Sequence, residues 1–253
     1  MNDQQLFALA HRSLWPFYRV LVDASPGASL LEFDGVQVAL TPSTPDRSIL
    51  NGVVYDNSGA LIEQIDRIAS TYEQAGISAW TVWVPAQDGE VAAALERAGN
   101  RLDAAPAAMA VELAERLPDN AGGRPDIETT DDIAAVCALN DHAYGYSDPN
   151  FAKALNKVPE GMRFYAIREN GEMISCIATM DIDGDCAIYM VATHAEARGR
   201  GLAGRLMARA LDDAVTRGCK TTSLQSTKLG YPVYRRLGYK DLGSIQMWER
   251  RTH

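Results

Sequence analysis

The chain has 253 residues, 47% hydrophobic and 23% charged, which is typical of a soluble globular protein with one large or two ordinary domains. Its formal net charge of −9 disfavours a nucleic-acid surface, which normally needs a basic face. No apolar run reaches the roughly 18 residues of a membrane span, and the first residues do not read as a signal peptide. The four cysteines stand singly, without the spacing of zinc ligands. We therefore expect a cytoplasmic protein that binds neither nucleic acid, membrane nor metal.

The first 117 residues alternate between helix and strand signals. Residues 6–22 predict a helix that is interrupted or restarted near Pro16, because proline lacks the N–H of a helix interior. Residues 30–40 predict one or two short strands around a turn at Asp34–Gly35. The next elements are expected to be strand 48–55, helix 61–72 ended by Gly76, strand 77–84, helix 90–98 ended by Gly99, and strand 108–113.

Residues 117–125 separate the two halves of the chain. Two prolines and two glycines without hydrophobic periodicity predict a linker there, with an ordinary surface loop as the alternative. We accordingly expect a first domain at 1–117, a linker at 118–125 and a second domain at 126–253.

The second half begins with helices and continues as a meander of strands. Thr130 and the two acidic residues after it predict a helix start. Asn170–Gly171 and Asp183–Gly184 predict tight hairpin turns. The remaining elements are expected to be helix 151–158, strands 163–169, 173–182 and 185–193, a helix from Leu202 that Gly218 ends, strand 219–226, helix 231–237 ended by Gly238, and strand 244–250.

The two halves repeat one order of elements. From residue 48 and again from residue 185, the order is strand, helix, glycine, strand, helix, glycine, strand. We interpret this as a tandem duplication of one α/β unit, against the alternative of a chance recurrence of a common pattern.

A glycine- and arginine-rich loop at 198–204 joins the strand 185–193 to the following helix. A glycine loop between a strand and a helix directs backbone N–H groups and the positive helix end at a phosphate. The loop also contains G-x-G-x-x-G, the dinucleotide fingerprint. That motif should follow a strand directly within a parallel βαβ unit, with an acid about 20 residues later. Here a polar turn intervenes, two hairpins precede the loop, and the next strand carries no acid.

Arg198-x-x-Gly201-x-Ala203 resembles the [Gln/Arg]-x-x-Gly-x-[Gly/Ala] loop of the GNAT acetyltransferase superfamily. The run from Gly230 to Tyr239 resembles the second signature of this family, a helix with a tyrosine followed by Gly-Phe or Gly-Tyr. The resemblance covers roughly residues 126–250, and residues 1–117 look like a degenerate copy. It implies an α/β (α+β) fold of two GNAT-like acyl-CoA N-acyltransferase units, each with a mostly antiparallel mixed sheet flanked by helices.

The resemblance implies an acetyl-CoA-dependent N-acetyltransferase that acts on a primary amine by direct attack. Tyr234 would be the general acid, with a plain core aromatic as the alternative. Thr227 stands where many members carry Asn, so a contact to CoA there is weakened or rerouted. The other expected cofactor residues are the strand end at Val191, Ala192 and Thr193, for the pantetheine arm and acetyl oxygen, and the loop at Arg198, Gly199, Arg200, Gly201, Leu202, Ala203 and Gly204, for the pyrophosphate.

The acceptor site and the general base are less defined by the sequence. Asp141, His142, Tyr144 and Tyr146 are candidates for the acceptor side, with plain packing as the alternative for the two tyrosines. The base is left open among Asp141, His142, Asp185 and Glu249. The acceptor is a small-molecule or peptide amine, and a homodimer is left open. A catalytically idle acyl-CoA-binding regulatory module is the alternative function, although such a module would not need a phenol at position 234.

Overall fold

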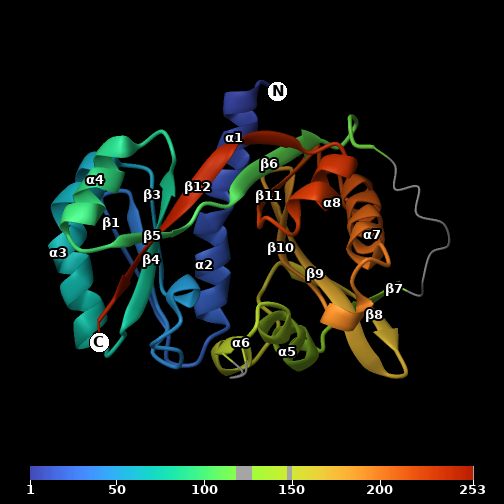
Figure 1. Ribbon diagram of the computed structural model, residues 1–253, viewed down its shortest axis with the longest axis horizontal. Coiled ribbons are helices and arrows are strands. Elements are labelled where there is room, and N and C mark those ends of the chain that lie inside the picture. Colours follow the sequence, from blue (N-terminus) through green and yellow to red (C-terminus); the bar gives the residue numbers. More distant parts are fainter. Residues whose placement is uncertain (118–126, 147–149, 253) are drawn as a thin grey trace.

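Twelve strands form one twisted sheet that runs through both halves of the chain in the computed structural model (Figure 1). The structure describes residues 1–117, 127–146 and 150–252, so the linker expected at 118–125 lies outside the described residues. The strands are β1 (Ser29–Phe33), β2 (Val36–Leu40), β3 (Gly52–Tyr55), β4 (Ala79–Pro85), β5 (Arg101–Ala104), β6 (Ala107–Glu112), β7 (Ile127–Thr130), β8 (Met162–Glu169), β9 (Glu172–Ile182), β10 (Asp185–Thr193), β11 (Thr221–Ser226) and β12 (Lys240–Arg251). Their order across the sheet is β1-β2-β3-β4-β12-β6-β11-β10-β9-β8-β7, with β5 paired to β12.

Helices flank this sheet and connect its strands. They are α1 (Asp3–Arg12), α2 (Leu14–Asp23), α3 (Ser58–Gln74), α4 (Gly89–Arg97), α5 (Ile133–Ala143), α6 (Asn150–Ala154), α7 (Leu202–Thr216) and α8 (Tyr231–Arg236), with 3-10 turns at Ser48–Leu50 and Ala195–Ala197. Among the described strands, the parallel pairs are β3–β4 and β10–β11, and each of these is joined by a crossover helix, α3 or α7. The mostly antiparallel mixed sheet flanked by helices is therefore confirmed.

The two halves exchange strands, which the sequence did not predict. Strand β6 of the first half pairs with β11 along its whole length and with the beginning of β12. The later part of β12, from Ile245 to Arg251, pairs with β4 of the first half. Figure 1 shows β6 and β12 crossing the middle of the molecule. The expected boundary between 1–117 and 126–253 thus lies between two halves, each of which completes its sheet with a strand of the other.

Helices α1 and α2 lie at this junction (Figure 1). They meet at Ser13, which confirms the predicted interruption, and Pro16 falls in the first turn of α2, where its missing N–H is harmless. Leu14 and Tyr18 share a buried cluster with Ala108 of β6 and Ile245 of β12. The N-terminal helices therefore pack against the strands that are exchanged.

The strand predicted at 48–55 is shorter than expected. Residues 48–50 form a 3-10 turn, and β3 begins at Gly52. The buried side chain of Asn51 explains this, because its Nδ2 donates to the carbonyls of Thr44 and Arg47 at 2.9 and 3.1 Å, and its Oδ1 accepts from Thr41 at 2.8 Å. These bonds fix a compact loop where the apolar pattern alone predicts an extended chain.

Candidate active site

A cavity of about 1260 Å³ opens where β10 and β11 separate. The two strands run parallel and pair only from Asp185 to Ala187 on β10 and from Thr221 to Ser223 on β11, so they diverge toward their C-terminal ends. A crevice at the carboxyl ends of parallel strands is a common ligand site. The lining includes Val191, Ala192, Thr193, Arg198, Gly199, Gly201, Leu202, Ala203, Gly204, Thr227 and Tyr234, together with Tyr144 from the acceptor side. Among the expected cofactor residues, Arg200 lies outside this lining.

A bulge in β10 interrupts strand pairing at residues that line the cavity. The register against β9 shifts between Tyr189 and Ala192, and Met190 takes a φ of 49°. A non-glycine residue in the left-handed region costs roughly 1–2 kcal/mol, so the surrounding structure must hold it there. The bulge takes Met190 and Val191, which line the cavity, out of regular pairing with β9. The apolar run around Met190 predicts a regular strand rather than this bulge.

The loop before α7 presents a row of backbone donors to the same cavity. Gly199 and Gly201 have φ values of 77° and 75°, which only glycine adopts easily. The N–H of Arg198 donates to Ala195, and the next N–H with a partner among the described residues is that of Arg205, which donates to Gly201. The six N–H groups from Gly199 to Gly204 lie between them, and α7 has no side-chain cap. Such an uncapped helix start is suited to a phosphate group.

The two arginines of the loop are bound to protein groups. The guanidinium of Arg198 donates to the carbonyls of Thr193 and Ala143 at 3.3 and 3.0 Å. The guanidinium of Arg200 forms an exposed two-point ion pair with Glu169. The backbone of this loop, rather than its arginine side chains, is therefore the part that is free to receive an anion.

Tyr234 points into the cavity from α8 and is only 5% exposed. Burial holds the pKa of its phenol well above the usual value, so the hydroxyl keeps its proton at physiological pH. Gly230 makes room for the ring, because a Cβ at Gly230 would lie 2.7 Å from Cε2 of Tyr234. Thr227 lines the cavity and its Oγ1 accepts a bond from the N–H of Gly230 at 3.2 Å, which leaves the hydroxyl proton available to a ligand.

The four residues expected on the acceptor side have different surroundings. Tyr144 follows α5, is half exposed and lines the cavity. Asp141 is buried and accepts a hydrogen bond from the N–H of Phe151 at 2.9 Å, at the start of α6. Asp141, His142 and Tyr146 lie outside the cavity lining. The ring of His142 stacks on that of His194, and the guanidinium of Arg47 lies over the ring of Tyr146.

Two of the candidate bases, Asp185 and Glu249, lie outside the cavity lining. Asp185 is buried at the paired end of β10 and β11, where its carboxylate accepts a bond from Ser223 at 2.6 Å. Glu249 lies on the part of β12 that pairs with β4, and it forms an ion pair with Arg251. Within the described residues that line the cavity, no Asp or Glu is found.

The first half braces one end of the cavity through residues at the junction of α1 and α2. Tyr189 and Gln225 line the cavity on the two separating strands. The hydroxyl of Tyr189 donates to the carbonyl of Ser13 at 2.8 Å, and Nε2 of Gln225 donates to Oγ of Ser13 at 3.2 Å. The ring of Phe17 stacks on Tyr189 at 4.8 Å. The junction of α1 and α2 thus braces the side chains that form this end of the cavity.

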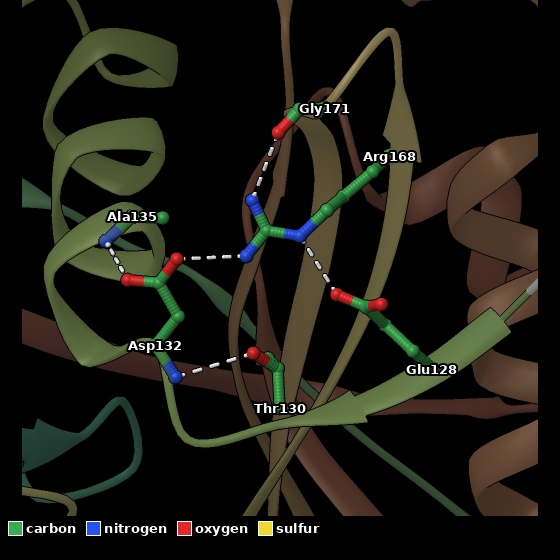
Figure 2. Close-up of polar contacts among 6 residues, drawn as sticks. All are labelled: Glu128, Thr130, Asp132, Ala135, Arg168 and Gly171. Atoms are coloured by element: carbon green, nitrogen blue, oxygen red, sulfur yellow. Dashed lines mark hydrogen bonds and ion pairs between the residues drawn. The ribbon is translucent and has the colours of Figure 1, made fainter.

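Helix α5, which carries Tyr144 at its C-terminal end, is anchored at its other end by Arg168 (Figure 2). The guanidinium of Arg168 contacts Glu128 at 2.7 Å, Asp132 at 2.8 Å and the carbonyl of Gly171 at 3.2 Å. Asp132 in turn caps α5 by accepting from the N–H of Ala135 at 3.1 Å. This arrangement joins the start of α5 to β7 and to the β8–β9 turn.

Residues 128–239 match the model of the acetyltransferase (GNAT) family. The fold is similar to a GCN5-related N-acetyltransferase from Kribbella flavida, at 18% identity and a TM-score of 0.67 over 96% of each chain. A tandem GNAT protein from the clavulanic acid biosynthesis pathway is 16% identical, with a TM-score of 0.60 over 90% of this chain and 84% of the other. At this level of identity the structural similarities establish the fold alone. Among curated proteins, no sequence matches the chain.

Two further observations concern membrane spans and metal ions. Within residues 1–117, 127–146 and 150–252, each helix falls short of the length and apolar character that crossing a membrane requires. The same residues include no group of three or more His, Cys, Asp or Glu side chains that could hold a metal ion. The match of residues 128–239 to the GNAT acetyltransferase model agrees with the resemblance that the motif around Gly201 indicated.

Proposed function

We propose that the chain transfers the acetyl group of acetyl-CoA to a primary amine by direct attack. Membership of the GNAT family supports acyl transfer in general. The observation that carries the finer proposal is that the loop from Gly199 to Gly204, whose backbone N–H groups have no acceptor among the described residues, lines the same cavity as Tyr234 at every position except Arg200. The backbone N–H groups suit a pyrophosphate, and the Tyr234 hydroxyl suits a departing thiolate.

The residues present fit acetyl-CoA as the co-substrate. When bound, this molecule supplies an activated thioester carbonyl and a pyrophosphate. The loop from Gly199 to Gly204 would hold the pyrophosphate through N–H groups that have no acceptor among the described residues. Val191, Ala192 and Thr193 would align the pantetheine arm along the separated edge of β10, and Thr227 has a hydroxyl proton to donate from the opposite wall.

The chain's own groups would act on the two charges that develop during transfer. As the new C–N bond forms and the C–S bond breaks, negative charge appears first on the carbonyl oxygen and then on sulfur. Backbone N–H groups near the β10 bulge would stabilise the first charge, because they are fixed in place before the reaction. Tyr234 would donate its proton to the second, acting as general acid. Its buried ring holds the hydroxyl in a fixed place within the cavity.

The attacking amine must lose a proton to become and remain neutral. Asp185 and Glu249 lie outside the cavity lining, as do Asp141 and His142. We therefore assign removal of this proton to water in the cavity rather than to a side chain that touches the amine. The acceptor would be a small-molecule or peptide amine, and the setting would be the cytoplasm.

Thiol release tests this function directly. The purified chain would be incubated with acetyl-CoA and a panel of free amino acids, polyamines, aminoglycosides and short peptides, with free CoA thiol measured by a chromogenic reagent. We expect release that depends on one class of amine, with the acetylated amine detected by mass spectrometry. Binding of CoA without release for any amine would instead indicate the idle regulatory module, and absence of CoA binding would contradict both.

A further inference from the structure

Arg198 connects the phosphate-side loop to the acceptor side of the cavity. Its Nε donates to the carbonyl of Thr193 at the end of β10, and its Nη2 donates to the carbonyl of Ala143 at the end of α5. Its own N–H is bound to Ala195. One side chain therefore ties together the loop, the strand end and the helix end.

The contact with α5 has a clear electrostatic basis. Ala143 is the last residue of α5, so its carbonyl is among the four that lack a partner within the helix. A cation near the C-terminal end of a helix is favourable because it opposes the helix dipole. Next to this contact, the rings of His142 and His194 stack at 4.6 Å with an interplanar angle of 12°. The same two chain segments are thus held together by two independent contacts.

The segment held by Arg198 forms the acceptor-side wall of the cavity. Tyr144 caps α5 through a bond from its N–H to Asn140, and Gly145 then turns the chain with a φ of 81°. Both residues line the cavity. On the other side of Arg198, the chain continues directly into the free N–H groups of Gly199 to Gly204.

We propose that Arg198 couples the two sides of the cavity. An anion bound by the loop fixes the backbone next to Arg198, and its guanidinium then holds Tyr144 in the position that receives the amine. Arg198 is a positioning residue in this proposal, and its side chain does not bind the pyrophosphate. The identity of the two ligands rests on the proposed function, whereas the coupling rests on the contacts of Arg198. Coupling of this kind is reciprocal between the two sites.

Hydrogen exchange of the backbone at residues 140–146 tests the coupling without enzyme activity. CoA is the probe, and the proteins are the wild type, Arg198→Ala and Arg198→Lys. In the wild type we expect CoA to slow exchange at 140–146. In Arg198→Ala we expect exchange there to be about tenfold faster, with no slowing by CoA, since two charge-assisted bonds are lost. Arg198→Lys keeps the charge without the forked donors, so we expect an intermediate result.

Arg168→Ala is the matched control, because Arg168 binds the opposite end of α5 through a comparable set of contacts (Figure 2). It should speed exchange near residues 128–135 and leave the CoA effect at 140–146 intact. Equal protection of 140–146 by CoA in Arg198→Ala would overturn the proposal. So would a loss of CoA affinity of about 100-fold with unchanged exchange at 140–146, because the guanidinium would then be a phosphate ligand.

Kinetics separate this proposal from the function on which it rests. With the best amine of the panel, Arg198→Ala should raise the KM for the amine about tenfold and the KM for acetyl-CoA less than about threefold. A wild type that acetylates no amine but shows the expected exchange pattern would contradict the proposed function and support the coupling. An active wild type would support the proposed function, and unchanged exchange and unchanged amine KM in Arg198→Ala would then contradict the coupling.

Discussion

Each half of the molecule has two parallel strands that separate before a helix start. We call this place the closed cleft in the first half, where a side chain caps the helix, and the open cleft in the second half, where the helix has no side-chain cap. In the first half, β3 and β4 pair in parallel at Gly52 and Val53 and then separate, as β10 and β11 do in the second half. A helix starts after each of the two strands, α3 in one half and α7 in the other. The strand and helix framework is therefore alike, and the difference lies in a few side chains around the two helix starts.

Asp88 binds residues at the closed cleft of the first half. Its Oδ2 accepts bonds from the hydroxyls of Tyr55 at 2.8 Å and Ser58 at 2.6 Å, so a carboxylate of the chain lies at the start of α3. Its Oδ1 accepts from the N–H of Val91 and so also caps α4. Asn57 caps α3 itself. The start of α7 has no such cap, so the two helix starts differ in polar side chains while the strand and helix framework is the same.

The proposed acid is also replaced in the first half. When the repeats are aligned on Gly99 and Gly238, Leu95 corresponds to Tyr234 and Val91 to Gly230. Leu95 and Val91 are fully buried and pack together in the first core, whereas Gly230 leaves the space that the Tyr234 ring requires. The first half thus retains the helix but has neither the phenol nor the room for one. Its contributions to the second cleft are structural, namely strand β6 and the brace at Ser13.

Blocking the open helix start should have the largest effect. Gly201→Asp places a Cβ and a negative charge in a loop position with a φ of 75°, so we expect loss of CoA binding in calorimetry. Gly59→Asp is the matched control at the corresponding position of α3, where a Cβ would make only an ordinary contact. It should leave one CoA per chain with unchanged affinity. Two equivalent CoA sites in the wild type, or full binding by Gly201→Asp, would mean that the working half is misassigned.

Removing the phenol should have the next largest effect. Tyr234→Phe keeps the ring and deletes the hydroxyl, so kcat should fall by about 10²-fold while CoA affinity changes little. Tyr231→Phe on the same helix is the control, since its hydroxyl contacts Asp241 outside the cavity lining. Steady-state kinetics with the best amine measure both. A Tyr234→Phe enzyme with the wild-type kcat would reduce Tyr234 to a packing residue.

Crowding the phenol should have a smaller effect. Gly230 has ordinary helical backbone angles, so Gly230→Ala introduces no backbone strain. The new Cβ would still lie 2.7 Å from the Tyr234 ring, which must therefore shift. We expect kcat to fall about tenfold, because a small displacement of a catalytic group is costly. In the double variant with Tyr234→Phe, the alanine should have little further effect on kcat. Independent, fully additive losses would show that Gly230 acts through another route.

The sequence predicted those features that depend on neighbouring residues. The glycines that end helices, the hairpin turns and the loop at 198–204 are local signals, and the structure has helices, turns and a helix start at these places. The family match at 128–239 confirms the resemblance on which the site residues were based. Local patterns also sufficed for the parallel pair β10–β11, because a strand, a crossover helix and a strand follow one another directly.

The features that the sequence did not predict depend on residues far apart in the chain. β6 pairs with β11 and β12 pairs with β4, and strand patterns alone do not show which half of the sheet each strand will join. The brace between Tyr189 and Ser13 joins residues 176 positions apart. Asp185 was a reasonable base by residue type, but its place on β10 is several residues before the bulge that faces the cavity. Residue type alone therefore did not show that Asp185 lies outside the cavity lining, because this depends on its position along β10.

Asp88→Ala should have the smallest effect on catalysis and a measurable effect on stability. The change removes the cap of α4 and leaves the hydroxyls of Tyr55 and Ser58 without this acceptor, so the free energy of unfolding should fall by about 1–3 kcal/mol. Urea unfolding measures this loss, and Asp88→Asn should lose less because its amide oxygen can still accept one of these bonds. The kcat should stay within about twofold of the wild type, since the proposed acid and the anion loop are in the other half. CoA stoichiometry should also stay at one, because Asn57 still caps α3 and Leu95 still replaces the phenol. A second CoA site in Asp88→Ala would show that this one carboxylate alone separates the closed cleft from the open one.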